Sequence, residues 1–170
     1  MSQYFGERHW RGTLAEAVAL GLRLEKATGQ VFTWLTSTNA GAAEVCRAAL
    51  GLLGIGEDDL DRGYLPDPSS KSTLPILARP GIVIRLTRNF DKQRGFVNGA
   101  VGTVYESLRG NEVFTVRLHG TGNLVLVYPM EEDGTNFLPC AYGYATTICR
   151  AQGASLLRGC IWLSQKRYAA

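Results

Sequence analysis

The densest β-type pattern in the chain lies at residues 81–130, which read GIVIRLTRNFDKQRGFVNGAVGTVYESLRGNEVFTVRLHGTGNLVLVYPM. Short runs of β-branched and aromatic residues are separated here by Gly, Asn and Arg. About four strands fit into this stretch, and strands of this length and spacing are typical of a small β-barrel. We therefore predict a β-module over residues 79–130.

The residues before this module follow a helix–strand–helix pattern. Apolar residues recur at helical spacing over 13–29, after a Thr13 cap with Glu16 three positions further on. A β-branched and aromatic run at 31–36 predicts a buried strand, and a second amphipathic helix is expected at about 42–53. This order of elements indicates an α/β domain.

Two further segments join the module to the rest of the chain. Residues 54–80 hold four of the six prolines and an acidic cluster, which predicts a surface connection. Residues 131–170 return to the α/β style, with a helix entered near Ala141 and a strand at 160–163. We thus divide the chain into 1–78, the inserted β-module and 131–170.

Composition narrows the functional classes. The chain has 170 residues, 45% of them hydrophobic, and a net charge of +3, which permits a polyanionic partner without requiring one. We expect no membrane association, because no apolar run is long enough to span a bilayer and no secretion-type leader is present. The four cysteines and two histidines lack the spacing of a metal site or disulfide framework, so we expect an intracellular, reducing compartment, the cytosol or the nucleus.

A basic run crosses the start of the β-module. Residues 79–94 carry five Lys or Arg residues against one acid, Asp91. This density suits contacts with nucleic-acid phosphates. A solvated barrel face would show the same pattern, so the run alone leaves both interpretations open. The nearby Asn98-Gly99 pair predicts a tight turn rather than a ligand contact.

A second candidate segment is residues 146–155, TTICRAQGAS. It combines hydroxyls, the cation Arg150, an amide and a glycine, which together can hold a phosphate. The alternative is an ordinary helix end at Gln152-Gly153.

Several motifs of catalysis are absent from the sequence. It contains no G-x-x-x-x-G-K-[ST] phosphate loop, no paired acids after a hydrophobic strand, and none of the G-x-S-x-G, H-E-x-x-H or G-x-G-x-x-G patterns. We therefore predict no catalytic residue and no metal ligand. Tyr142 and Tyr144 could stack on bases or share one face of a strand.

Three elements, taken in order, resemble the C-terminal half of Pif/RecD-like helicases of superfamily 1. WLTSTNAGAAEVCRAAL at 34–50 is similar to the strand and helix that open the second RecA-like domain of that family. LTRNFDKQRGFVNGAVGTV at 86–104 matches the family's L-x-x-N-x-D…G-[LF]-V-N-G-x-x-G-x-V pattern. YATTICRAQGASL at 144–156 is similar to the A-x-[ST]-[IV]-H-K-[ST]-Q-G-x-[ST] motif. The resemblance covers roughly residues 30–165.

This resemblance implies an α/β fold: an incomplete RecA-like domain of the P-loop NTPase type, interrupted by a Src-homology-type small β-barrel that leans over single-stranded DNA. The nucleic-acid contacts that it implies are Arg85, Arg88, Asn89, Lys92, Arg94, Asn98, Thr147 and Arg150. The cleft that couples DNA contact to the ATP state would hold Thr38, Asn39, Gln152, Gly153 and Ser155.

The sequence also departs from the family pattern. Cys149-Arg150-Ala151 stands where the family has His-Lys-Ser, so that only the charge is kept. The first RecA-like half, with the phosphate loop and the magnesium-binding acid, has no counterpart, and the chain stops before the arginine-finger motif. We expect a fragment of an ATP-dependent 5′-to-3′ DNA helicase that binds single-stranded DNA, but neither ATP nor magnesium by itself.

Two alternatives remain open on these residues. One is a non-catalytic interaction or structural protein that reuses the helicase fold within an assembly, since fold alone does not set function. The other is an enzyme whose missing first half comes from a partner chain or domain.

Overall fold

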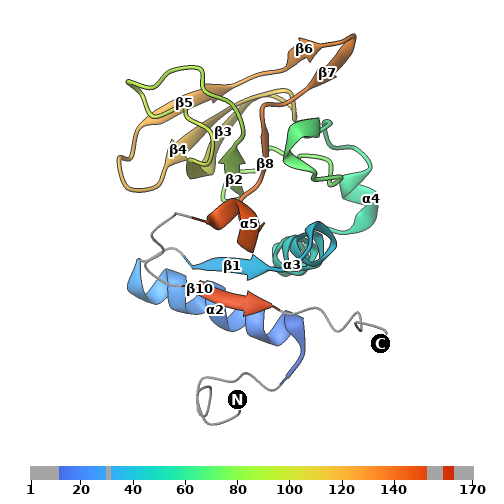
Figure 1. Ribbon diagram of the computed structural model, residues 1–170, viewed down its shortest axis with the longest axis vertical. Coiled ribbons are helices and arrows are strands. Elements are labelled where there is room, and N and C mark those ends of the chain that lie inside the picture. Colours follow the sequence, from blue (N-terminus) through green and yellow to red (C-terminus); the bar gives the residue numbers. More distant parts are fainter. Residues whose placement is uncertain (1–11, 30–31, 153–158, 163–170) are drawn as a thin grey trace.

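The computed structural model describes residues 12–29, 32–152 and 159–162. It has two parts (Figure 1). We call residues 54–142 the β-part, in which most of the regular secondary structure is β-strand. The α/β part consists of residues 12–53, 144–152 and 159–162 within the described ranges, and two long helices accompany its small sheet.

The first long helix, α2, spans Leu14–Thr28 and has local signals at both ends. The Thr13 hydroxyl accepts a hydrogen bond from the Glu16 amide at 3.2 Å, and the Glu16 carboxylate accepts one from the Thr13 amide at 3.1 Å. This reciprocal pair satisfies two amides that the helix itself leaves unpaired. Gly29 ends the helix in the left-handed region, with φ of 66°. The predicted helix is confirmed.

The second long helix, α3, spans Asn39–Leu52 and begins somewhat earlier than the sequence pattern indicated. Its cap is Thr38, whose hydroxyl accepts a hydrogen bond from the Gly41 amide at 3.0 Å. The apolar face of α3 packs into the core, where Val45 and Leu50 are fully buried.

Three parallel strands form the sheet of the α/β part. These are β1, Thr33–Thr36; β9, Ala145–Thr147; and β10, Gly159–Trp162, in the order β10-β1-β9. The register places Thr36 beside Thr147, at the carboxyl ends of β1 and β9. Because these strands run in the same direction, the loops that leave them emerge at one edge of the sheet.

A five-stranded antiparallel sheet forms most of the β-part. Its strands are β2, Val83–Leu86; β3, Val101–Arg109; β4, Val113–Leu118; β5, Leu124–Val127; and β8, Cys140–Tyr142. They lie in the order β5-β4-β3-β2-β8, so the first four are the predicted meander and β8 extends the sheet beyond residue 130. Two shifts of register between β3 and β4 increase the local twist of this long pair.

A separate two-stranded hairpin follows the sheet. It consists of β6, Met130–Glu132, and β7, Thr135–Phe137. Asp133 and Gly134 form its turn, and both have positive φ, 51° and 75°.

Residues 54–80 are not the surface connection that their prolines suggested. Ile76 and Leu77 are buried in the same core as the two sheets. Two short helices lie within the segment: α4, Glu57–Leu60, and the 3-10 helix η2, Pro68–Ser70. The apolar residues here have neither helical nor alternating spacing, so the sequence pattern does not distinguish them from a loop.

Residues after 139 form two short strands, β8 and β9, where the sequence suggested a helix near Ala141. The helix comes later, as α5, Ile148–Ala151. Tyr142 and Tyr144 are both buried, and the Tyr144 hydroxyl accepts a hydrogen bond from the Val83 amide at 3.1 Å. Neither ring is therefore available to stack on a base.

Within the described residues, no helix is both long and apolar enough to cross a membrane. The same residues contain no group of three His, Cys, Asp or Glu side chains that could hold a metal ion.

Candidate nucleic-acid interface

A cavity of about 250 Å³ lies where the β-part and the α/β part meet, and we call it the α3–β9 cavity. Its lining comes from the first two turns of α3, the end of η2 and the chain just after it, strand β2, and residues 141, 142, 145–147 and 150. The carboxyl end of β9 and the start of α3 both contribute to it. This edge of a parallel sheet is the usual place for a ligand site in α/β proteins.

Three cations line the cavity: Lys71, Arg85 and Arg150. Among the described lining residues, none carries a carboxylate. Burial lowers the pKa of the Arg85 guanidinium, and repulsion from Arg150 lowers it further. A nitrogen of Arg85 donates a hydrogen bond to the Ala145 carbonyl at 3.4 Å. Positive groups held together without an acid attract anions, and a phosphate group is well matched to arginine.

Neutral polar groups complete the lining. Asn39 is the first residue of α3, and Thr147 is the last residue of β9. Thr147 is almost buried, and its hydroxyl accepts a hydrogen bond from the Arg150 amide at 3.4 Å. Helix α3 is 14 residues long, so its amino end adds the positive end of a helix dipole to the cavity. Ser72 and Thr73 add two hydroxyls.

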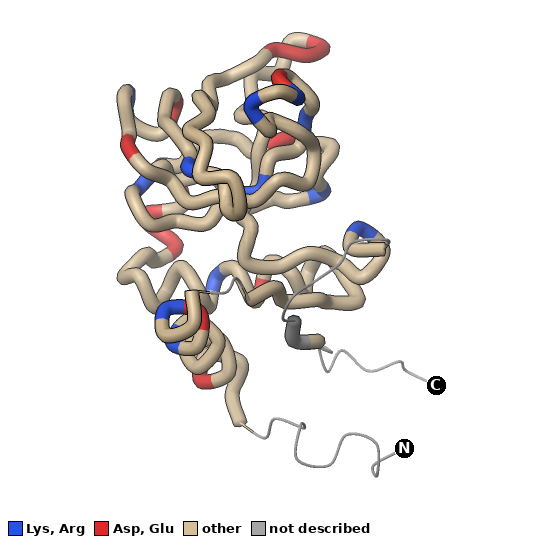
Figure 2. The backbone as a smooth tube through the Cα atoms, turned by 90° about the vertical axis from the view of Figure 1, so that its left-hand side faces the viewer, with Lys and Arg blue, Asp and Glu red and all other residues tan. Residues whose placement is uncertain are grey.

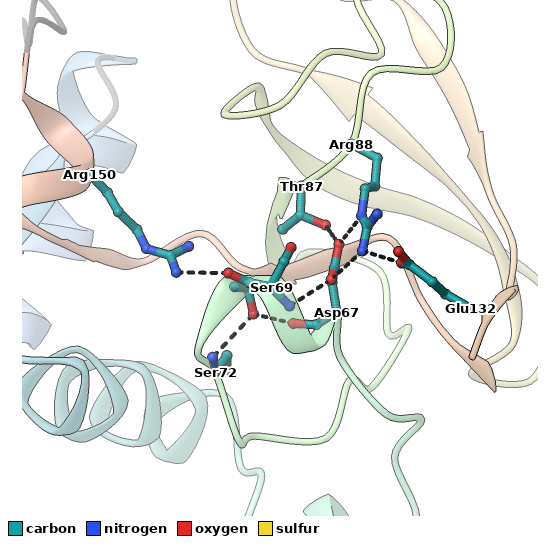
Figure 3. A network of polar contacts seen from close by, with 8 residues as sticks. Asp67, Ser69, Ser72, Thr87, Arg88, Glu132 and Arg150 are labelled. Carbon is teal, nitrogen blue, oxygen red and sulfur yellow. Dashed lines mark hydrogen bonds and ion pairs between the residues drawn. The ribbon is translucent and has the colours of Figure 1, made fainter. Parts of the chain in front are cut away.

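A buried carboxylate holds the helix η2 beside this cavity (Figure 3). Asp67 is 0% exposed and accepts hydrogen bonds from the Ser69 amide, the Thr87 hydroxyl at 2.6 Å, and Nε and Nη2 of Arg88 at 2.7 and 3.0 Å. Glu132 contacts Arg88 Nη2 from the opposite side at 2.8 Å. Burial alone would raise the pKa of Asp67, but these hydrogen bonds lower it to about 2.

Arg88 thus lies in an internal ion pair, apart from the α3–β9 cavity. Its side chain is 27% exposed, and its guanidinium lies 5.2 Å from the centre of the Phe137 ring. Asp67 and Glu132 already occupy two of the three guanidinium nitrogens. This arrangement does not support the DNA contact predicted for Arg88.

The next two cations of the basic run, Lys92 and Arg94, lie in a loop formed by residues 87–99. Arg94 pairs with Asp91 at 3.7 Å, and Lys92 is exposed. The Asn98 amide donates to the Asn89 side chain at 2.9 Å, which closes the loop on itself. Figure 2 shows the basic positions scattered along the backbone among acidic and uncharged ones, rather than gathered in one stripe.

The residues predicted for the nucleotide-coupling cleft have different fates. Asn39 lines the α3–β9 cavity, whereas Thr38 uses its hydroxyl to cap α3. Gln152 is exposed at the end of α5. Gly153 and Ser155 lie outside the described residues. Of the predicted positions, the structure brings together Asn39, Arg85, Thr147 and Arg150.

Sequence reasoning missed the contribution of the chain just after η2. Residues 70–73, Ser-Lys-Ser-Thr, all line the cavity. The usable signal was a lysine among hydroxyls directly after an Asp-Pro turn, a composition that suits phosphate binding. The surrounding prolines hid this signal, because they favoured a simple linker.

Cys46 also lines the cavity, from α3. Burial raises the pKa of its thiol to about 11. The thiol is therefore neutral at physiological pH and contributes apolar surface rather than a nucleophile.

Comparisons with known proteins bear on the fold. No family model and no curated protein matches this sequence. A Bacteroides Pif1 helicase in complex with ADP-AlF3 and ssDNA matches with a TM-score of 0.57 and 18% identity, over 86% of this chain and 39% of that one. Bacteroides Pif1 bound to ssDNA matches with a TM-score of 0.54 and 21% identity, over 77% of this chain and 34% of that one. Pif1 helicase from Candida albicans matches with a TM-score of 0.52 and 19% identity, over 86% of this chain and 43% of that one.

These matches establish the class of fold. The chain is a mixed α/β protein whose fold is similar to part of the Pif1 helicases. It spans less than half the length of those three structures.

Proposed function

We propose that this chain binds the sugar–phosphate backbone of single-stranded DNA in the α3–β9 cavity, as one piece of a Pif1-like DNA helicase. The observation that carries the proposal is the grouping of Lys71, Arg85 and Arg150 without a carboxylate in the described lining. The amino end of α3 and several hydroxyls lie in the same cavity. These donors suit phosphate oxygens, so binding would depend little on base sequence.

The structural neighbours support the same ligand. Two of the matching Pif1 structures were solved with ssDNA. In our proposal the chain supplies the DNA-facing side of an ATP-dependent 5′-to-3′ motor, corresponding to an incomplete RecA-like domain with an inserted small barrel. A second chain or domain supplies the other half.

Magnesium does not fit the described cavity. No carboxylate in its described lining could ligand Mg²⁺, an ion that requires hard oxygen ligands. The sequence also lacks a phosphate loop. We therefore propose that ATP and magnesium bind elsewhere in the complete motor. The pure chain should not hydrolyse ATP, and activity should appear only when a partner with a phosphate loop is added.

The direct test is fluorescence anisotropy of a labelled single-stranded oligonucleotide, titrated with the pure chain at several salt concentrations. We expect salt-sensitive binding, because phosphate contacts release counterions. Arg150→Ala should weaken binding roughly tenfold, since it removes a charged donor from the cavity.

Arg109→Ala is the matched control. Arg109 also carries one positive charge, is 77% exposed, and does not line the cavity. It should leave the affinity within about twofold of the unchanged chain, as expected for an exposed charge that is paired with Glu112 at the surface. Absence of any binding at low salt, or equal losses in the two variants, would reject the proposed site.

One observation favours a second candidate function, that of an interaction protein. Strand β5 is an edge of the five-stranded sheet, and Leu124, Leu126 and Tyr128 are 43%, 45% and 51% exposed. An edge strand with apolar outward side chains can pair with a strand of another molecule. If β5 pairs between copies, light scattering will show concentration-dependent dimers that Leu124→Lys/Leu126→Lys abolishes.

A further inference from the structure

The backbone of Lys71 has an uncommon conformation. Its φ and ψ are 60° and 7°, in the left-handed region that glycine or asparagine normally occupies. Lys71 directly follows η2 and lines the α3–β9 cavity. A lysine persists in this conformation only when its surroundings fix it, and such residues concentrate at functional sites.

Hydrogen bonds fix the chain on both sides of Lys71. On one side, the Ser70 hydroxyl donates to the Asp67 carbonyl at 2.7 Å. On the other, the Ser72 amide donates to the Ser70 hydroxyl at 3.1 Å. The amide of Lys71 itself donates to the Pro68 carbonyl at 3.2 Å. The turn therefore depends on the placement of Asp67.

Asp67 is in turn anchored to the β-part. Its amide donates to the Cys140 carbonyl of β8 at 3.2 Å. Its carboxylate is held by Thr87 and Arg88, which directly follow β2. From the α/β part, Arg150 Nη2 donates to the Ser69 carbonyl at 3.1 Å (Figure 3). The turn that carries Lys71 is thus held between the two parts of the molecule.

We propose that Asp67 and Arg88 are positioning residues that hold Lys71 in the α3–β9 cavity, where Lys71 binds a DNA phosphate. This inference rests on the proposed function. It gives Arg88 an indirect role in binding: its guanidinium fixes Asp67, Asp67 fixes η2, and η2 sets the place of the Lys71 ammonium group.

The negative charge of Asp67 distinguishes this mechanism from long-range electrostatic attraction. Asp67→Asn makes the chain more positive by one charge, so long-range attraction alone predicts tighter DNA binding. The positioning mechanism predicts the opposite, because the neutral amide cannot hold Arg88 with the same hydrogen bonds. The two explanations therefore predict changes of opposite sign.

The experiment measures the dependence of affinity on salt by anisotropy, with a labelled oligothymidine as the probe. Lys71→Gln should make the negative slope of log K against log salt shallower by about 0.7, the value of one single-strand phosphate contact. Lys92→Gln makes the same charge change on the 87–99 loop and should leave the slope unchanged. Asp67→Asn should make the slope shallower as Lys71→Gln does, whereas Asp58→Asn, on an exposed residue of α4, should not.

The double variant Lys71→Gln/Asp67→Asn tests whether the two residues act as one unit. Its affinity should equal that of Lys71→Gln alone, since the contact that Asp67 supports is already gone. Additive losses would overturn the inference, as would a Lys71→Gln variant that binds like the unchanged chain, or an Asp67→Asn variant that binds as tightly or more tightly.

A charge-neutral variant covers the case in which Asp67→Asn does not fold. Thr87→Val removes one hydrogen bond to Asp67 and keeps nearly the same shape. Like Lys71→Gln, it should weaken DNA binding, measured at temperatures where circular dichroism shows that the variant and the unchanged chain are both folded. Unchanged binding would overturn the positioning role. If the unchanged chain itself does not bind DNA at low salt, the proposed function fails before any variant is compared.

Discussion

Two short segments of this chain, which both carry cations, contrast sharply. The first, residues 85–94, carries four cations and is prominent in the sequence, while the second, residues 67–73, holds one lysine in a proline-rich stretch. In the structure, Arg88 of the first segment pairs with Asp67 of the second, and Lys71 of the second reaches the α3–β9 cavity. The number of cations in a stretch of sequence therefore does not predict how many can bind a ligand, because acids that are close in the fold pair with some of them.

The largest effect should come from removing the acid that joins these segments. Asp67→Ala leaves the Arg88 guanidinium partly buried beside Glu132 only, and it should lower the free energy of unfolding by about 3 kcal/mol. Urea denaturation followed by circular dichroism measures this. Asp58→Ala, which removes an exposed acid, is the control and should change it by less than about 0.5 kcal/mol. Similar values for both variants would mean that the Asp67 pair does not join the segments.

Acid should weaken the same junction. The pKa of Asp67 is about 2 in the folded chain, against 3.8 for an ordinary aspartate. The lower folded value means that the stabilisation is complete above about pH 4 and is lost as pH falls towards 2, by about 2 kcal/mol. Urea denaturation at a series of pH values should show this loss in the unchanged chain. In Asp67→Asn, the free energy of unfolding should not show this loss between about pH 4 and 2. An identical pH profile in that variant would assign the loss to other groups.

DNA binding should distinguish the α3–β9 cavity from the 87–99 loop. Arg150→Ala, in the cavity, should cost roughly tenfold in affinity, which is about 1.4 kcal/mol. Lys92→Ala/Arg94→Ala removes two charges from the 87–99 loop and should cost less than that single change, because neither residue lines the cavity. Anisotropy titrations at one fixed salt concentration compare them. A larger loss in the loop variant would move the interface to the loop.

The smallest effect concerns the backbone at Lys71. Lys71→Gly relieves the left-handed conformation and should raise the free energy of unfolding by about 1 kcal/mol. The same variant should bind DNA more weakly, since it removes a cation. Denaturation and anisotropy on the same samples test both signs. A variant that is less stable, or that binds more tightly, would contradict the assigned role of Lys71.

Local signals in the sequence predicted the long helices and the strands β2 to β5. Thr13 with Glu16, and Gly29, set the ends of α2 through contacts within a few residues. The strands β8 and β9 were missed because each has only three residues, too few to show an alternating pattern. Their pairing partners, β2 and β1, lie far away in the sequence.

The candidate site was predicted in part for a related reason. Asn39 begins α3, a helix that the sequence pattern indicated, whereas Thr147 and Arg150 lie in the 146–155 segment that its composition and the family resemblance singled out. The place of Lys71 depends on Asp67, whose partner Arg88 lies 21 residues further along the chain. Only the three-dimensional fold brings that acid and that base together, so composition within one segment cannot reveal it.

The pairing of β1 with β9 also bears on the order in which the parts of the protein fold during its synthesis. Trp34 of β1 lies beside Ala145 of β9. Along the sequence, these two strands are separated by β2 to β5, which pair with their sequence neighbours. While the ribosome makes the chain, β1 and α3 emerge early but lack the strand that covers their edge. We therefore expect the antiparallel sheet to form first, and the two preceding helices to complete their packing only after β9 has been translated.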